Sequence, residues 1–159
     1  MKLFNIASMA IVHLLTAGCT TDAHETRVEQ LEGGYAVDLP LGYQASMRGD
    51  MPDFVVYAVA DKAGRESLLI YLGDSPEDHP TTPKEAVRSS PHIGGYEATS
   101  VRWSEDDGTS SGSTLIRLEN TGERPAFAHI IFQHLSNSES RVAEEILSTF
   151  RRVDNASKK

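Results

Sequence analysis

The chain has 159 residues, of which 39% are hydrophobic and 24% are charged, and its formal net charge is −8. This length fits one domain of about 140 residues with short terminal segments, and the composition is typical of a folded protein. The acidic charge argues against nucleic-acid binding, which needs a basic stripe, and against a polybasic contact with a membrane surface.

The first 18 residues have the features of a secretory signal peptide. Lys2 is followed by a mostly apolar stretch, residues 3–15, and then by the small residues Thr16, Ala17 and Gly18. About 13 apolar-rich residues are too few to span a bilayer as a helix, which takes about 20, but they fit the apolar region of an export signal. We therefore expect the chain to be exported.

The single cysteine, Cys19, directly follows these small residues. The sequence LTAGC resembles the lipobox of bacterial lipoproteins, although Thr16 stands where leucine is usual. We predict a lipoprotein signal peptide over residues 1–18 and lipid attachment at Cys19, which leaves no free thiol and no disulfide. Because Thr20 rather than aspartate follows, we expect the periplasmic face of the outer membrane. An ordinary signal peptide or a buried thiol would not explain why the only cysteine falls here.

The next segments are predicted to be a tether and the first strands of a domain. Residues 19–32 are polar and are predicted to be a tether to a domain formed by residues 33–153. Apolar and polar residues alternate over 35–39, which predicts a strand. Residues 54–60 and 67–73 are predicted to be buried strands of an antiparallel hairpin, because the short turn between them leaves no room for a crossover.

The second half of the chain is predicted to contain two helices and three strands. Residues 82–90 should form a short helix, because Thr82 can cap it, Pro83 suits its first position and Glu85 would complete a capping box. An apolar stripe predicts a long amphipathic helix over residues 136–153, followed by a disordered tail, 154–159. The strands of a meander are predicted at residues 98–104, 113–120 and 126–135.

The order of these elements predicts an α+β domain. We expect a single antiparallel β-sheet of about five to six strands, with the short helix and the long C-terminal helix packed on it. The stretches GGYAVDLPLGY, FVVYAVADKAGRESLLIYLG and AEEILSTFR resemble the Mog1/PsbP-type fold, including small bacterial lipoproteins of the DcrB-like kind. The resemblance covers most of residues 33–152, and it implies a non-enzymatic binding or accessory role without naming a partner.

Two acidic loops are candidate partner-binding sites. The first follows the predicted hairpin and is stiffened by Pro76 and Pro80, which lowers the entropy lost on docking. The second is a turn of the meander. Carboxylates in these loops would speed association with a protein partner that carries a basic surface, above all if both loops lay at one end of the sheet. The candidate residues are Asp74, Glu77, Asp78, Asp106 and Asp107.

The sequence predicts no catalytic residues, no cofactor and no metal site. The serine-rich stretches are expected to be loops. His129 and His134, five apart on one predicted strand, would point to opposite faces and could not chelate one ion together. Asp74, Glu77, Asp78 and His79 could surround Ca²⁺ or Zn²⁺ in principle, but their spacing matches no EF-hand. Tyr35, Tyr43 and Tyr96 are either aromatic anchors for a partner or part of the core.

The expected function is binding by a non-enzymatic, lipid-anchored, periplasm-facing protein. Its partner would be another protein, so that the chain acts as an immunity or inhibitor protein against a secreted toxin, or as an envelope accessory factor. The alternative is a periplasmic carrier or sensor that holds a small ligand or a metal in a pocket between the sheet and the helices.

Overall fold

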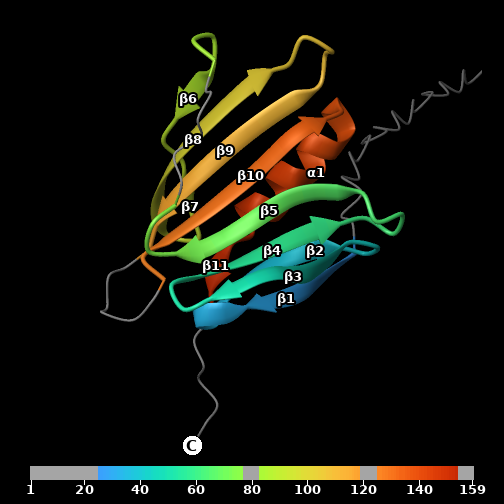
Figure 1. Ribbon diagram of the computed structural model, residues 1–159. Coiled ribbons are helices and arrows are strands. Elements are labelled where there is room, and N and C mark those ends of the chain that lie inside the picture. Colours follow the sequence, from blue (N-terminus) through green and yellow to red (C-terminus); the bar gives the residue numbers. More distant parts are fainter. Residues whose placement is uncertain (1–24, 77–82, 119–124, 154–159) are drawn as a thin grey trace, which may run out of the picture.

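The structure is a computed structural model that describes residues 25–76, 83–118 and 125–153, and its strands form two antiparallel sheets (Figure 1). The one α-helix of the described residues is α1 (Asn137–Ser148), and a 3-10 turn, Glu32–Gly34, joins the first two strands. The strands are β1 (Thr26–Leu31), β2 (Tyr35–Pro40), β3 (Gln44–Met51), β4 (Phe54–Ala60), β5 (Glu66–Gly73), β6 (Val87–Ser89), β7 (His92–Ile93), β8 (Tyr96–Ser104), β9 (Ser110–Arg117), β10 (Phe127–Leu135) and β11 (Arg151–Arg152).

The large sheet has the strand order β3-β4-β5-β10-β9-β8-β6, and β7 also pairs with β8. The predicted hairpin is confirmed, because β4 pairs antiparallel with β5, and so is the predicted meander of β8, β9 and β10. The core-facing side chains of neighbouring strands lie side by side, as the pairing of Tyr57 with Ile70 and of Ile70 with Ile130 shows. The alternate residues of the same strands therefore form the other face.

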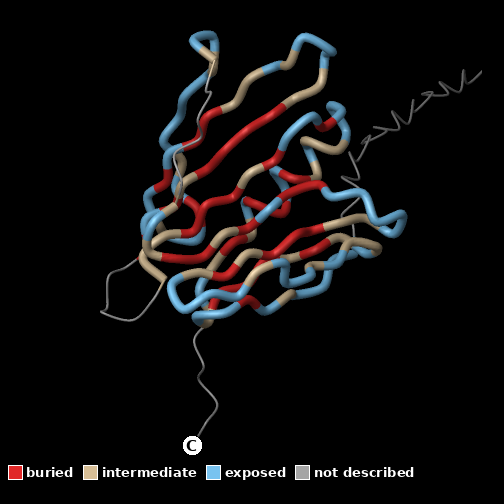
Figure 2. Tube along the Cα trace, viewed as in Figure 1, coloured by how far each residue is buried: buried red, intermediate tan, exposed pale blue. Residues whose placement is uncertain are grey.

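One face of the large sheet is covered by α1 and by the small sheet, whose order is β1-β2-β11. Seven strands spaced about 4.8 Å apart are nearly 30 Å wide, whereas a 12-residue helix is about 18 Å long and about 10 Å wide. The helix alone is too small to bury that face, so the small sheet buries the rest. Figure 2 shows the buried residues along the central strands and on the elements behind them.

Helix α1 begins at a complete capping box, in which the side chain of Ser136 accepts a hydrogen bond from the backbone N–H of Glu139, and the side chain of Glu139 accepts one from the backbone N–H of Ser136. Its buried residues Ala143, Ile146 and Leu147 face the core, as the apolar stripe predicts. The helix ends before Phe150, earlier than expected. Residues 151 and 152 pair with β2 instead of continuing the helix.

The predicted fold class is wrong. Of the described residues, 58% lie in strands and 13% in helices, and there are two sheets rather than one. The helix expected over residues 82–90 is, where described, a turn closed by a hydrogen bond from Ala86 N to Pro83 O, followed by β6. The residue types that predict the start of a helix there also favour a turn. Residues 87–89 form a strand because they pair with the edge of β8.

The domain also begins earlier than expected. Residues 26–31, which we assigned to the tether, form β1 and pair with all of β2. Their polar composition reflects their position at the edge of the small sheet, where five of the six side chains are at least partly exposed.

The strands of the large sheet run between two ends of the molecule. One end, called here the Lys62 end, carries the β4–β5 turn, the β8–β9 turn and the start of α1, toward the right of Figure 1. The other, called the Asp53 end, carries the β3–β4 turn and the end of β5.

Candidate functional site

The two acidic loops lie at opposite ends of the large sheet. Asp74 directly follows β5 at the Asp53 end, whereas Asp106 and Asp107 lie in the β8–β9 turn at the Lys62 end. The nine residues of β10 separate these ends by about 27 Å. The described residues therefore form no single acidic prong. Glu77 and Asp78 lie outside the described residues, as do His79 and Cys19.

Two of the described acidic candidates hold their own loops in shape. Asp74 Oδ1 accepts a hydrogen bond from Ala126 N at 3.3 Å, which joins the end of β5 to the start of β10. Asp107 Oδ1 accepts one from Thr109 N at 2.9 Å and so closes its turn. Asp106 is exposed and makes no hydrogen bond or ion pair with another described residue.

Several carboxylates at the Lys62 end are held in the charged form. Backbone and side-chain N–H groups of Arg65 donate to Asp61 and lower the pKa of its carboxyl group. The hydroxyl of Thr109 lowers the pKa of Asp107 in the same way, and the hydroxyl of Ser136 lowers that of Glu139. These hydrogen bonds favour the ionised form, because the donor groups need an acceptor and the charged carboxylate provides one.

We expect Asp61→Asn to destabilise the protein more at pH 7 than at pH 2.5. The pKa of Asp61 is lowered on folding, so its contribution to stability is present above the pKa of the unfolded chain and is lost as the pH falls through the folded value. Urea unfolding at the two pH values, followed by circular dichroism, measures the difference. Asp106→Asn is the matched control and should change stability at neither pH. An equal loss for Asp61→Asn at both values would contradict the charge argument.

The second face of the large sheet is not covered by any helix or sheet of the described residues (Figure 1). We call it the open face. It carries partly exposed apolar and aromatic side chains between smaller polar ones, since β-strand residues alternate between faces. Its residues are Phe54, Val56, Ala58, Leu69, Tyr71, Glu97, Thr99, Val101, Trp103, Ser113, Leu115, Arg117, Phe127, His129 and Ile131.

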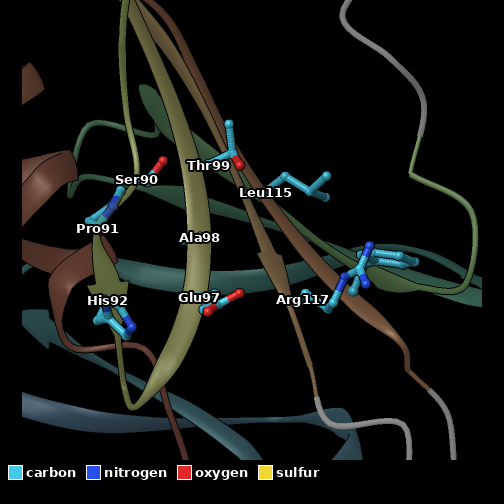
Figure 3. A pocket seen from close by; sticks show the side chains of 9 residues that line it. Ser90, Pro91, His92, Glu97, Ala98, Thr99, Leu115 and Arg117 are labelled. Atoms are coloured by element: carbon cyan, nitrogen blue, oxygen red, sulfur yellow. The ribbon is translucent and has the colours of Figure 1, made fainter.

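A cavity of about 440 Å³ lies on the open face toward the Asp53 end. Strand β8 contributes Glu97 and Thr99, strand β9 contributes Leu115 and Arg117, and β10 contributes Phe127. Figure 3 shows this lining, with the segment 90–92 on the other side of β8. Its lining mixes apolar side chains, such as Leu115 and Phe127, with the charged or polar side chains of His92, Glu97 and Arg117.

The charged side chains around the cavity make no polar contacts that hold the described part of the fold together. Glu97, Arg117 and His92 are exposed, and their side chains make no hydrogen bond or ion pair with another residue in the described part of the chain. Other arginines of the protein are paired: Arg102 with Glu144 and Arg151 with Asp38. The guanidinium of Arg117 is therefore available to bind a carboxylate from outside the chain.

Next to the cavity, a buried polar pair lies on the open face. Ser113 Oγ and His129 Nε2 are 2.6 Å apart, and both residues are buried. Ser113 lies within β9, whose backbone pairs with β8 on one side and β10 on the other. Its neighbouring N–H groups are taken up by the sheet, so they cannot stabilise an oxyanion as a serine hydrolase requires. The geometry fits a pair that satisfies two buried polar groups.

The second histidine of the predicted strand, His134, lies in an irregular part of β10. The pairing of β10 with β9 is irregular between Phe132 and Leu135, and His134 has a positive φ of 52°. Its Nδ1 lies 3.8 Å from Asp107 Oδ2.

The serine-rich β8–β9 hairpin contains the spacing of a nucleophile elbow, with Ser110 two residues from Gly108 and from Gly112. In hydrolases that elbow joins a strand to a helix. Here Ser110 begins β9 directly after a hairpin turn, so the context does not fit a nucleophile. The expectation that this stretch is a loop is wrong for residues 110–113, which begin strand β9.

The three candidate aromatic anchors pack with the core instead of facing a partner. Tyr35 is buried and its ring stacks on Phe150 with a centroid distance of 5.3 Å. Tyr96 meets Tyr35 edge-on at 6.4 Å, and Tyr43 packs against the same core. The sequence analysis did not single out the aromatic side chains of the open face. They alternate along their strands with the core-facing residues and therefore point to the other side of the sheet.

The described ranges, 25–76, 83–118 and 125–153, contain neither a cluster of metal ligands nor a membrane-spanning helix. No three His, Cys, Asp or Glu side chains converge there to hold a metal ion, and no helix there is long and apolar enough to cross a membrane. Comparisons of the chain with protein-family models and with curated proteins find no match.

Proposed function

We propose that this protein is a lipid-anchored, periplasm-facing binding protein that docks a protein partner on its open face, around the cavity. The observation that carries the proposal is the cavity itself, whose lining mixes the apolar side chains of Leu115 and Phe127 with Glu97, Arg117 and His92, whose side chains pair with no other described residue. Protein interfaces likewise combine aromatic and aliphatic anchors with polar and charged groups. Anchoring through Cys19 rests on the sequence LTAGC.

A protein partner fits the cavity better than a small molecule does. Ligand pockets typically bury 70–90% of a small ligand's surface. Here Glu97, Thr99, Arg117 and His92 are exposed, so the walls leave one side of any occupant uncovered. A side chain that projects from a partner would have its remaining surface covered by the partner itself.

The acidic charge favours a partner with a basic surface. A net charge of −8 on a chain of this size would speed encounters with a basic protein and disfavour acidic ones. Arg117 would then fix the local position of the partner by pairing with one of its carboxylates. Because the acidic loops lie at opposite ends, the charge acts over the whole surface and not through one prong.

We expect Arg117→Glu to reduce recovery of the partner from solubilised envelopes by about 10-fold or more, since losing the pairing of Arg117 with a partner carboxylate, if this is a hot-spot contact, costs about 2 kcal/mol. Arg152→Glu is the matched control: it makes the same charge change at an exposed arginine of β11, outside the open face. Affinity capture followed by mass spectrometry is the measurement. Recovery of no partner by the unaltered protein, or equal recovery by Arg117→Glu, would refute the proposal. The identity of the partner separates an inhibitor of a toxin from an envelope accessory factor.

A small-ligand carrier is the second candidate function. It is favoured by the cavity volume, which lies within the 300–1,000 Å³ usual for ligand sites. Thermal stabilisation of the unaltered protein by a metabolite, lost in Arg117→Glu but kept in Arg152→Glu, would support the carrier over the protein-binding role.

A further inference from the structure

We propose that the anchor holds the Lys62 end toward the membrane and presents the cavity at the far end, about 30 Å further into the aqueous compartment. Its partner would then approach from the aqueous side and not along the membrane surface. This inference rests on the proposed acylation of Cys19, and it adds an orientation that the anchor alone does not supply.

The place where the chain enters the domain is defined by hydrogen bonds. Glu25 O accepts from Leu41 N at 3.0 Å, and Thr26 pairs with Pro40 at the end of β2. Residue 25 therefore lies beside the β2–β3 turn.

That turn belongs to the Lys62 end. The strand that follows it, β3, begins at Gln44, which pairs with Ala60 at the end of β4. Gly42 in the turn lies against the side chain of Lys62, because a Cβ placed on Gly42 would be 3.2 Å from the Cδ of Lys62. The entry point of the chain and the β4–β5 turn are therefore neighbours.

The linker between the anchor and this point is short. Five residues separate Cys19 from Glu25, and six residue steps of an extended chain reach about 20 Å at most. The tether expected from sequence, residues 19–32, would have reached more than twice as far. The structure shortens it because β1 uses residues 26–31.

The short linker excludes an inverted orientation. Nine residue steps along and beside β4 separate Asp53 from Lys62, a distance of about 30 Å. With the Asp53 end on the bilayer, the linker would have to cover that distance, which exceeds its reach. The cavity residues Arg117 and Phe127 lie toward the Asp53 end, since Phe127 pairs with Gly73.

The orientation can be measured with two matched cysteine variants, Lys62→Cys and Asp53→Cys, at exposed turn positions on either end of β4. Acylation of Cys19 leaves the introduced cysteine as the only free thiol. Each full-length variant is purified from membranes, labelled with a donor dye and reconstituted into phosphatidylcholine vesicles that carry a headgroup acceptor dye. We expect several-fold faster energy transfer from position 62 than from position 53.

The outcomes separate the orientation from the anchoring. Protein that does not float with the vesicles would overturn the acylation and the orientation together. Floating protein with equal transfer from the two positions, or with faster transfer from position 53, would overturn the orientation alone. Inserting about 20 Gly/Ser residues between Ala23 and His24 lengthens the r.m.s. span of the linker to roughly 28 Å and should abolish the difference. A difference that survives this insertion would show that linker length is not its cause.

Discussion

Phe150→Ala should lower the free energy of unfolding by about 4 kcal/mol. The ring is fully buried and stacks on Tyr35, where α1 ends and the chain turns into β11. Removing it would leave a cavity between the helix, the small sheet and the large sheet, and cavities of this kind cost about 3–5 kcal/mol. A domain of this size is stable by about 5–15 kcal/mol, so the loss is a large fraction. Denaturant unfolding at pH 7 measures it.

Phe127→Ala is the matched control, because it removes the same atoms from a partly exposed phenylalanine of the open face. Its cost should stay below about 1.5 kcal/mol, since much of the ring is already in contact with water. If the two variants lost equal stability, the open face would be as tightly packed as the core. The assignment of that face as a free binding surface would then be wrong.

Cys19→Ala should move the protein from the membrane fraction to the soluble fraction, or leave it as a precursor that keeps residues 1–18. The chain has no other cysteine that could accept a lipid. Each buried CH₂ contributes about 0.8 kcal/mol to membrane affinity, and two or more acyl chains anchor a protein stably. Fractionation of envelopes, with intact-mass measurement of the protein, shows both the location and the modification.

Thr20→Ala, one residue further on, is the control and should stay membrane-bound. A Cys19→Ala protein that remains entirely with the membranes would show that the anchor is not a lipid on this residue. An unmodified thiol at Cys19 in the native protein, with residues 1–18 still attached, would lead to the same conclusion.

Part of the fold follows from local pattern. The hairpin of β4 and β5 is marked by two apolar runs around a short turn, and the meander and the buried face of α1 are marked by apolar periodicity, because each of these elements packs against the core along most of its length. Strands β1, β3 and β6 carry no such pattern. They lie at sheet edges, where most side chains are exposed and composition says little about conformation.

The candidate site depended even more on the tertiary structure. Asp74 and Asp106 were visible as acidic loop residues, but only the register of β10 with β5 and β9 shows that they lie at opposite ends. Glu97, Arg117 and Phe127 are unremarkable in the sequence. They come together because neighbouring antiparallel strands place residues of the same parity on one face.

The sequence by itself determined the single domain, the acidic charge, the main hairpin, the meander, the C-terminal helix and the prediction for Cys19, since these depend on composition and on neighbours along the chain. Only the tertiary structure decided that there are two sheets, that residues 26–31 belong to the domain, and that the charged side chains lining the cavity pair with no other described residue. These properties depend on pairing between distant segments, such as Arg151 with Ala36, and the free energy of such pairing is not encoded in any local stretch.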